Sequence, residues 1–171
     1  MEKKLSREHV FYAFSPELSP ALRVAQGEEF VLETHDCFSG QLKSEQDLLD
    51  SLDWDRINPA TGPVLIENVQ PGDVVRVDLL KVNVVGQSTM VTLPGEGALG
   101  DRITEMETAV LKYEGGKVIF RNKLEIPIAP MVGVIGVAPG EGKVPNGEPG
   151  AHGGNMDCTL ITEGASIYFT A

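Results

Sequence analysis

The sequence predicts a mostly β protein, an antiparallel β-sandwich with one short helix. Two observations carry this prediction. The 171 residues include 19 glycines and 11 prolines, which separate short apolar runs rich in β-branched residues, the pattern of strands bounded by turns. No segment alternates strands with long helices, which argues against an α/β architecture. Because a chain of this length can bury a substantial core, residues 1–171 are predicted to form a single β-sandwich domain.

Eight short segments are expected to be strands. At residues 75–80, Val75, Val77 and Leu79 alternate with Arg76, Asp78 and Leu80, which is the period of a half-buried strand. The glycine pair at 115–116 predicts a tight hairpin turn between two other segments. The expected strands are residues 30–34, 64–69, 74–85, 108–113, 117–121, 131–137, 159–162 and 166–170.

The one helix is expected within residues 44–54. This segment opens with SEQD, which resembles a capping box, and continues with leucines at helical spacing, at positions 48, 49 and 52. We expect it to end near Trp54, before the Asn58-Pro59 step. By contrast, residues 138–151 hold too many glycines and prolines for regular structure, and a loop of that length is typically functional or disordered.

Charge and hydropathy exclude several classes of partner. Asp and Glu number 25 against 14 Lys and Arg, a formal net charge of −11, so neither a nucleic acid nor an anionic membrane is expected to bind. No apolar run is long enough to span a bilayer, and the charged start lacks the apolar segment of a signal peptide. A cytoplasmic protein with reduced thiols at Cys37 and Cys158 is the expectation.

Two segments carry side chains that could take part in catalysis or in binding a metal ion. Residues 33–38 (ETHDCF) and residues 149–158 (PGAHGGNMDC) each place a His, an Asp and a Cys within a few positions. Imidazole, carboxylate and carboxamide groups that converge on one point would suit a metal ion or a small polar substrate.

The spacing in each segment leaves two interpretations open. On an extended strand His35 and Cys37 point to one face and Asp36 to the other, so spacing alone favours an ordinary strand end. In the second segment the glycines let His152 and the following polar residues face one cavity. The alternative is a Gly-rich turn in which Asn155 and Asp157 hydrogen-bond their own backbone.

A third polar segment, residues 58–63 (NPATGP), is a rigid turn that offers Asn58 or Thr61 as hydrogen-bond donors, although such a segment is more often only a turn. The sequence holds no phosphate-binding loop, no Ser-centred nucleophile elbow and no CxxC pair for structural zinc.

Taken together, the motifs resemble the acetamidase/formamidase family. Five segments carry the resemblance, in the family's order: residues 34–41 (THDCFSGQ), 58–63 (NPATGP), 71–73 (PGD), 126–139 (IPIAPMVGVIGVAP) and 152–157 (HGGNMD). The resemblance implies hydrolysis of short amides to a carboxylate and ammonia, with some members opening lactams. It also implies a jelly-roll-like β-sandwich and, commonly, a homo-oligomer.

The chain departs from the family in one respect. The resemblance implies members about twice this length, whose second half carries a Gly-Asp-x-His-Ala motif and a Gly-Asp-Gly-Glu motif, and neither occurs in these 171 residues. We therefore expect the chain to correspond to an N-terminal half, either shortened or completed by a partner chain. An unpaired strand edge left at such a cut would favour association.

The resemblance to the family also implies roles for individual residues of this chain. A divalent metal ion, zinc, is predicted to bind His35, Asp157 and His152, because zinc accepts nitrogen and oxygen ligands and activates water. The predicted catalytic residues are Asn155, as a hydrogen-bond donor to the developing oxyanion, together with Asp36 and Cys37. The predicted substrate-binding residues are Asn58, Thr61, Gly153 and Gly154.

Two alternatives stay open beside this scheme. A thiol route would make Cys37 the nucleophile next to His35. A non-catalytic binding domain or subunit, which keeps the fold without turnover, is the alternative to an enzyme. In either case the predicted ligand is a small neutral amide, which gains little from the net charge of the protein.

Overall fold

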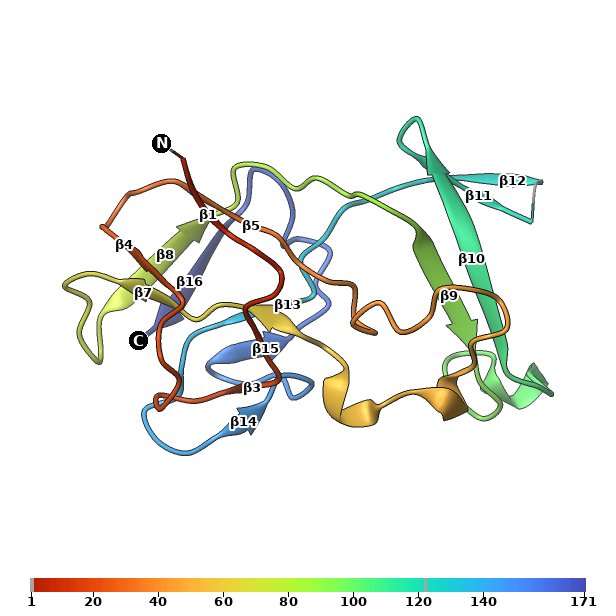
Figure 1. Ribbon diagram of the computed structural model, residues 1–171, viewed down its shortest axis with the longest axis horizontal. Helices are drawn as coiled ribbons and strands as arrows, with labels where there is room; N and C mark the ends of the chain where they lie inside the picture. The colour runs from red at the N-terminus through yellow and green to blue at the C-terminus, as the bar shows by residue number, and fades with distance from the viewer. Residues whose placement is uncertain (1, 122) are drawn as a thin grey trace. The chain divides into compact units, whose positions relative to one another are not determined.

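The computed structural model describes residues 2–121 and 123–171, and it confirms the mostly β fold class. The chain divides into two compact units (Figure 1). Unit 1 comprises Met1–Ser39, Asp55–Val82 and Met131–Ala171, and unit 2 comprises Gly40–Trp54 and Asn83–Pro130. The prediction of a single domain over residues 1–171 stays a prediction.

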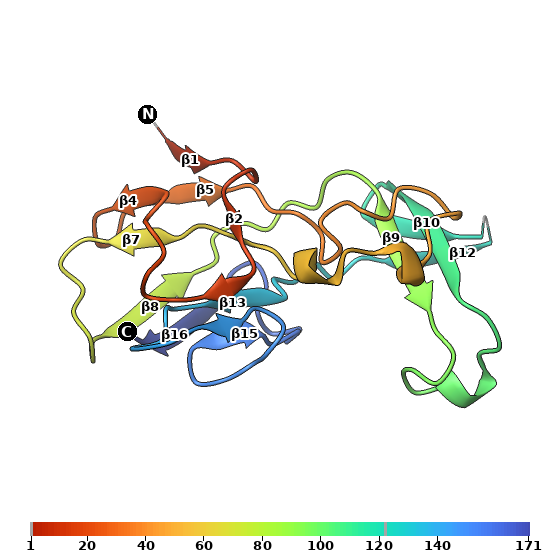
Figure 2. The same ribbon diagram turned by 60° about the horizontal axis from the view of Figure 1, so that its bottom comes forward.

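Unit 1 is built from short strand pairs, several of which join segments far apart in the sequence. Figure 2 shows β13 beside β15 and β8 beside β16. Two pairs are parallel: β1 (Lys3–Leu5) with β5 (Phe30–Leu32), and β4 (Leu22–Val24) with β7 (Val64–Ile66). The antiparallel pairs are β2 (Val10–Phe11) with β6 (Ala60–Thr61), β3 (Ala13–Phe14) with β14 (Val144–Pro145), β8 (Val74–Asp78) with β16 (Ser166–Thr170), and β13 (Val134–Gly136) with β15 (Gly153–Asn155).

Unit 2 holds a four-stranded antiparallel sheet in the order β12-β11-β10-β9. The predicted hairpin turn is confirmed, because Gly115 and Gly116 join β10 to β11 with φ of 57° and 80°, values that favour glycine. The strands are β9 (Ser88–Thr92), β10 (Glu107–Glu114), β11 (Lys117–Phe120) and β12 (Leu124–Pro127), and a 3-10 turn, η3 (Gly100–Arg102), lies between β9 and β10.

Each unit buries its own apolar side chains. The predicted alternation is confirmed within β8, since Val75 is buried and Val77 half-buried while Arg76 and Asp78 are exposed. Its partner β16 contributes Phe169 to the same buried face. The other buried apolar residues are Leu5, Phe14, Val24 and Ile161 in unit 1, and Leu42, Leu49, Leu52, Leu111 and Val118 in unit 2.

The helix expected over residues 44–54 is present only as two 3-10 turns, η1 (Leu49–Ser51) and η2 (Trp54–Arg56). Half of the capping box forms, because the backbone N–H of Ser44 donates to the Asp47 carboxylate at 2.9 Å. Leu48 then adopts an extended conformation, with φ −106° and ψ 160°, so the turn does not propagate. The leucines at helical spacing therefore reflect the burial of Leu49 and Leu52, and not the presence of an α-helix.

The strand expected over residues 159–162 was wrong. This segment is a turn, in which the backbone N–H of Ile161 donates to the carbonyl of Cys158 at 2.9 Å. Its apolar character reflects the burial of Ile161, which is 7% exposed. The sequence also missed β15, because its two glycines suggest a loop. We find that these glycines allow β15 to lie very close to β13.

Candidate active site

The first predicted segment follows β5 and forms a turn. The Asp36 carboxylate oxygen Oδ1 accepts a hydrogen bond from the backbone N–H of Phe38 at 2.8 Å, and the Asp36 carbonyl accepts one from Ser39 at 3.0 Å. Asp36 and Cys37 are exposed, and His35 is half-buried. The carboxylate of Asp36 therefore helps to shape the turn that carries its two neighbours.

Residues 58–61 hold this turn in place. The backbone N–H of Asn58 donates to the carbonyl of Cys37 at 2.7 Å, and the Thr61 hydroxyl Oγ1 donates to the carbonyl of Glu33 at 2.7 Å. Asn58 has a φ of 51°, which asparagine tolerates better than most residues. Both residues predicted to bind substrate therefore also support the backbone of the 33–38 segment.

The second predicted segment belongs to β15. Gly153 pairs with Gly136 and Gly154 with Ile135, and both glycines of β15 are buried. A Cβ at Gly153 would collide with the carbonyl oxygen of Ile135, and one at Gly154 with that of Glu148. The structure gives these glycines a packing role, and their predicted role in substrate binding stays a prediction.

Asn155 and Asp157 form a pair at the end of β15. With its amide nitrogen facing the carboxylate, Asn155 Nδ2 donates to Asp157 Oδ1 and Oδ2 at 3.2 and 3.3 Å. Asp157 is exposed and Asn155 is half-buried, and Asp157 has a φ of 43°. A carboxylate held by an amide and open to solvent can accept a proton or a hydrogen bond from a small substrate.

His152, unlike the exposed Asp157, packs against an aromatic ring. Its imidazole meets the buried Phe14 ring edge to face, with centroids 5.1 Å apart, and lies next to the backbone of Gly150 and Gly154. Its Nε2 is buried, and no residue among 2–121 and 123–171 hydrogen-bonds it. These contacts are those of a packed histidine, and its predicted role as a metal ligand stays a prediction.

The two segments come within electrostatic reach of each other at Cys37. Burial of the thiol raises the pKa of Cys37, and the carboxylates of Asp36 and Asp157 raise it further. The residue as a whole is exposed, so the desolvation acts on the sulfur locally. The charge of Asp157, at the end of β15, therefore acts on the thiol of the 33–38 turn.

A metal ion needs more convergence than these residues provide. In the part of the chain that the structure describes, no group of three or more His, Cys, Asp or Glu side chains is placed to hold a metal ion. His152 in particular packs on Phe14. The described residues of this chain therefore do not form a zinc site by themselves.

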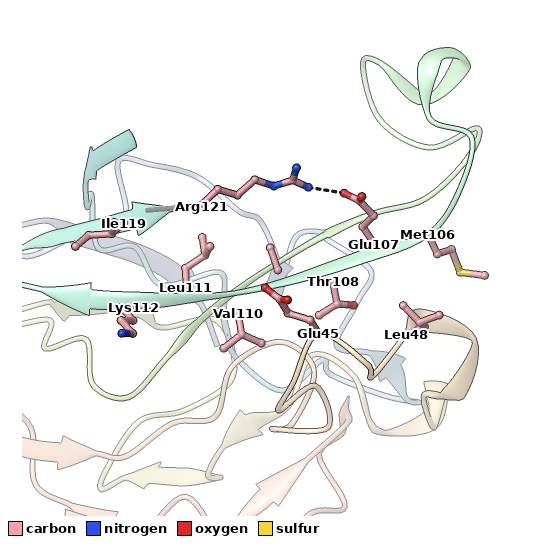
Figure 3. A pocket seen from close by; sticks show the side chains of 11 residues that line it. Glu45, Leu48, Met106, Glu107, Thr108, Val110, Leu111, Lys112, Ile119 and Arg121 are labelled. Atoms are coloured by element: carbon pink, nitrogen blue, oxygen red, sulfur yellow. Dashed lines mark hydrogen bonds and ion pairs between the residues drawn. The ribbon is translucent and has the colours of Figure 1, made fainter. Parts of the chain in front are cut away.

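Unit 2 contains an open cavity of about 610 Å³ that the sequence did not predict (Figure 3). The cavity runs along β10. An ion pair lies at its wall, between Arg121 Nη2 and Glu107 Oε2, which are 2.9 Å apart. None of the predicted site residues lines it. Its lining includes Glu45, Leu48, Thr108, Leu111, Lys112 and Ile119.

Comparison with known proteins identifies the family. The model of the acetamidase/formamidase family matches residues 1–146. The chain belongs to the acetamidase/formamidase family. The resemblance of the sequence motifs is thereby confirmed.

Solved relatives share the fold over nearly the whole chain. The structure of a predicted acetamidase/formamidase from Thermoanaerobacter tengcongensis is 48% identical with a TM-score of 0.95, and the match covers 100% of this chain and 57% of that one. An acetamidase from Bacillus halodurans is 38% identical with a TM-score of 0.94, covering 98% of this chain and 57% of that one.

A curated formamidase from Methylophilus methylotrophus is 27% identical over an alignment of 134 positions, and this alignment covers 72% of this chain and 33% of that protein. This member of the acetamidase/formamidase family therefore spans little more than half the length of the solved relatives and a smaller share of the curated one. In the described residues, no helix is long and apolar enough to cross a membrane.

Sequence reasoning missed two residues that support the candidate site. Asn146 is 1% exposed, and its Nδ2 donates to the carbonyl of Asn58 at 2.8 Å. Gly133 lies directly beneath the Asp157 carboxylate. Asn146 belongs to the Gly/Pro-rich loop and Gly133 to an apolar run. Neither lies in a cluster of polar side chains, so the sequence pattern did not indicate a functional role for them. Only the loop's unusual length pointed towards a function.

Proposed function

We propose that this chain contributes the N-terminal part of an enzyme that hydrolyses short-chain amides, such as formamide or acetamide, to a carboxylate and ammonia. Membership of the acetamidase/formamidase family and the names of its relatives support the reaction class. The observation that carries the proposal is the Asn155–Asp157 pair, whose exposed Asp157 carboxylate acts electrostatically on the Cys37 thiol.

Amide hydrolysis adds water to the carbonyl carbon and then breaks the carbon–nitrogen bond. In our proposal the Asp157 carboxylate takes a proton from the attacking water and later gives it to the departing nitrogen, which leaves as ammonia. One N–H of Asn155 faces Asp157, so the other is available to the substrate carbonyl oxygen as it gains negative charge. Asp36 stays a candidate for a second carboxylate at this site.

The thiol route is less favourable in this environment. Because burial and two nearby carboxylates raise the pKa of Cys37, its thiol stays protonated at neutral pH. The thiolate, which is the reactive nucleophile, is then scarce. We propose that Cys37 lines the site rather than attacking the amide, and that Asn58 and Thr61 hold its turn.

Zinc is retained only as a proposal. His35, Asp157 and His152 are the proposed ligands. Because the described residues hold no group of three such side chains placed around one point, a further ligand would have to come from outside them. When bound, zinc would polarise the amide carbonyl or activate water. Metal content of the purified chain, measured with and without the complementary segment of a relative, tests this.

Assembly and location are also proposals. We propose association with a second copy or with a chain that supplies the remainder of the relatives' length. Cys37 and Cys158 are both free thiols, which supports a reducing, cytoplasmic location.

Ammonia release from formamide and acetamide tests the reaction. We expect Asp157→Asn to lower kcat by at least about a hundredfold, because an amide cannot act as a base. Asp101→Asn in unit 2 is the matched control and should keep the activity. Equal activity of the Asp157→Asn variant and the wild-type chain would contradict the proposed base.

The alternative is a non-catalytic binding subunit. The partial coverage of the relatives supports it, because the match covers only 57% of the Thermoanaerobacter relative. It predicts saturable binding of acetamide, seen by calorimetry, without ammonia release. It also predicts that the complementary segment of a relative does not restore turnover.

A further inference from the structure

We propose that Gly133 is a positioning residue, whose missing side chain provides the space in which the Asp157 carboxylate lies. Gly133 directly precedes β13 in the apolar run at residues 126–139. Its effect on turnover rests on the function proposed above, whereas its effect on the position of Asp157 does not.

The geometry around Gly133 differs from that around its neighbours. A Cβ there would lie 2.7 Å from Asp157 Oδ1, 3.9 Å from Asp157 Cγ and 3.8 Å from the side-chain amide of Asn155. The shortest of these distances is closer than Cβ atoms come to other atoms, so the carboxylate would have to move. At Gly136 and Gly153, by contrast, the nearest atoms are backbone, so those two glycines serve the packing of β13 on β15.

Space, rather than backbone freedom, is what Gly133 supplies. Gly133 does not have a positive φ, so alanine can adopt its backbone conformation. The residue that does have a positive φ is Asp157, at 43°. Here the carbonyl of Gly133 accepts hydrogen bonds from the backbone N–H of both Met156 and Asp157, at 3.0 and 3.3 Å. Two residues opposite one form a bulge, a feature that redirects side chains.

Asn155 provides the second restraint on the same carboxylate. Its Nδ2 reaches both oxygens of Asp157 at 3.2 and 3.3 Å, and it pairs with Val134, the residue after Gly133. A carboxylate displaced by a side chain at residue 133 would change both of these contacts. The space left by Gly133 and the amide of Asn155 therefore both restrain the orientation of Asp157.

A double-mutant cycle tests the inference. Gly133→Ala is made in the wild-type chain and in an Asp157→Gly background, where the carboxylate is gone and the positive φ is well tolerated. The control is Gly140→Ala, because Gly140 also lacks a positive φ and a Cβ added to it would have no other atom within 4 Å. Thermal unfolding and ammonia release are measured for each variant.

We expect Gly133→Ala to lower the unfolding midpoint by about 2 °C in the wild-type chain, because the exposed Asp157 carboxylate can rotate away but then loses its contacts with Asn155. In the Asp157→Gly background the same change should leave the midpoint within about 1 °C. If the chain releases ammonia, Gly133→Ala should also lower kcat/KM about tenfold or more, since small misplacements of a catalytic group have large effects. It should have no further effect once Asp157 is replaced.

An equal fall of the midpoint in both backgrounds would overturn the inference, because it would mean that Gly133 serves the backbone. So would a chain with amidase activity in which Gly133→Ala matches Gly140→Ala in both measurements. If the wild-type chain releases no ammonia, the proposed activity fails for this chain alone. The thermal cycle then still decides whether Gly133 positions Asp157.

Discussion

The side-chain amide of Asn146 donates to the carbonyl of Asn58 at 2.8 Å, although the two residues lie 88 positions apart in the sequence. The same Nδ2 donates to the carbonyl of Phe11, also at 2.8 Å. Asn58 in turn donates its backbone N–H to the carbonyl of Cys37 at 2.7 Å. One buried amide thus connects the Gly/Pro-rich loop to the turn that carries the candidate site.

Replacing Asn146 should destabilise the chain. Asn146→Ala leaves the half-buried carbonyls of Phe11 and Asn58 without this donor, so we expect a loss of about 1–3 kcal/mol in the free energy of unfolding, measured by urea denaturation. Asn146→Asp should lose at least as much, because its carboxylate would face two carbonyl oxygens. The exposed Asn83→Ala is the control and should change stability little. A similarly small loss for Asn146→Ala would contradict this role.

His152 can be tested as a packed residue. Since its ring meets Phe14 edge to face and its Nε2 has no partner in the described part of the chain, His152→Phe should keep the stability or raise it slightly. His152→Ala should lower the free energy of unfolding by about 2 kcal/mol or more, because it leaves a cavity. Loss of activity or bound metal in a stable His152→Phe variant would instead support the predicted ligand role.

The reactivity of Cys37 should report the charge on Asp157. Because the Asp157 carboxylate raises the pKa of the Cys37 thiol, Asp157→Asn should lower that pKa and speed alkylation at pH 8 by about twofold. Mass spectrometry of the peptide that contains Cys37 measures the rate separately from Cys158. Asp101→Asn should leave the rate unchanged. An unchanged rate in Asp157→Asn would mean that the two segments lie further apart than we infer.

Asp47 should make the stability depend on pH in acid. Hydrogen bonds from the backbone N–H of Lys43 and from the Ser44 hydroxyl and N–H lower the pKa of Asp47 below its ordinary value, which is about 3.9. The unfolded chain thus binds this proton more readily than the folded one. The stabilisation is complete above about pH 4 and is lost as the pH falls through the lowered pKa.

We expect Asp47→Asn to remove this part of the acid dependence. Urea midpoints measured between pH 2 and pH 7 should fall less steeply in acid for the variant than for the wild-type chain. The exposed Asp50→Asn serves as the control. Parallel curves for the wild-type chain and the Asp47→Asn variant would show that the three hydrogen bonds do not hold the carboxylate in solution.

Local patterns account for much of what the sequence predicted correctly. The alternation that begins at Val75 and the glycine pair at 115–116 are properties of neighbouring residues. The first is confirmed within β8 and the second in the β10–β11 hairpin. The helix over residues 44–54 was expected from equally local signals. It reduces to 3-10 turns because the burial of Leu49 and Leu52 is satisfied by a different backbone path.

The sequence by itself determined the fold class, the family and the two polar segments, because composition, turn chemistry and motif order are written along the chain. Only the tertiary structure decided how those segments are used. It packs His152 on Phe14, lets the charge of Asp157 act on the Cys37 thiol, and gives Gly133 and Asn146 their supporting roles. The physical reason is that pairing between distant strands and the burial of single atoms depend on residues far apart in the sequence, which no local pattern specifies.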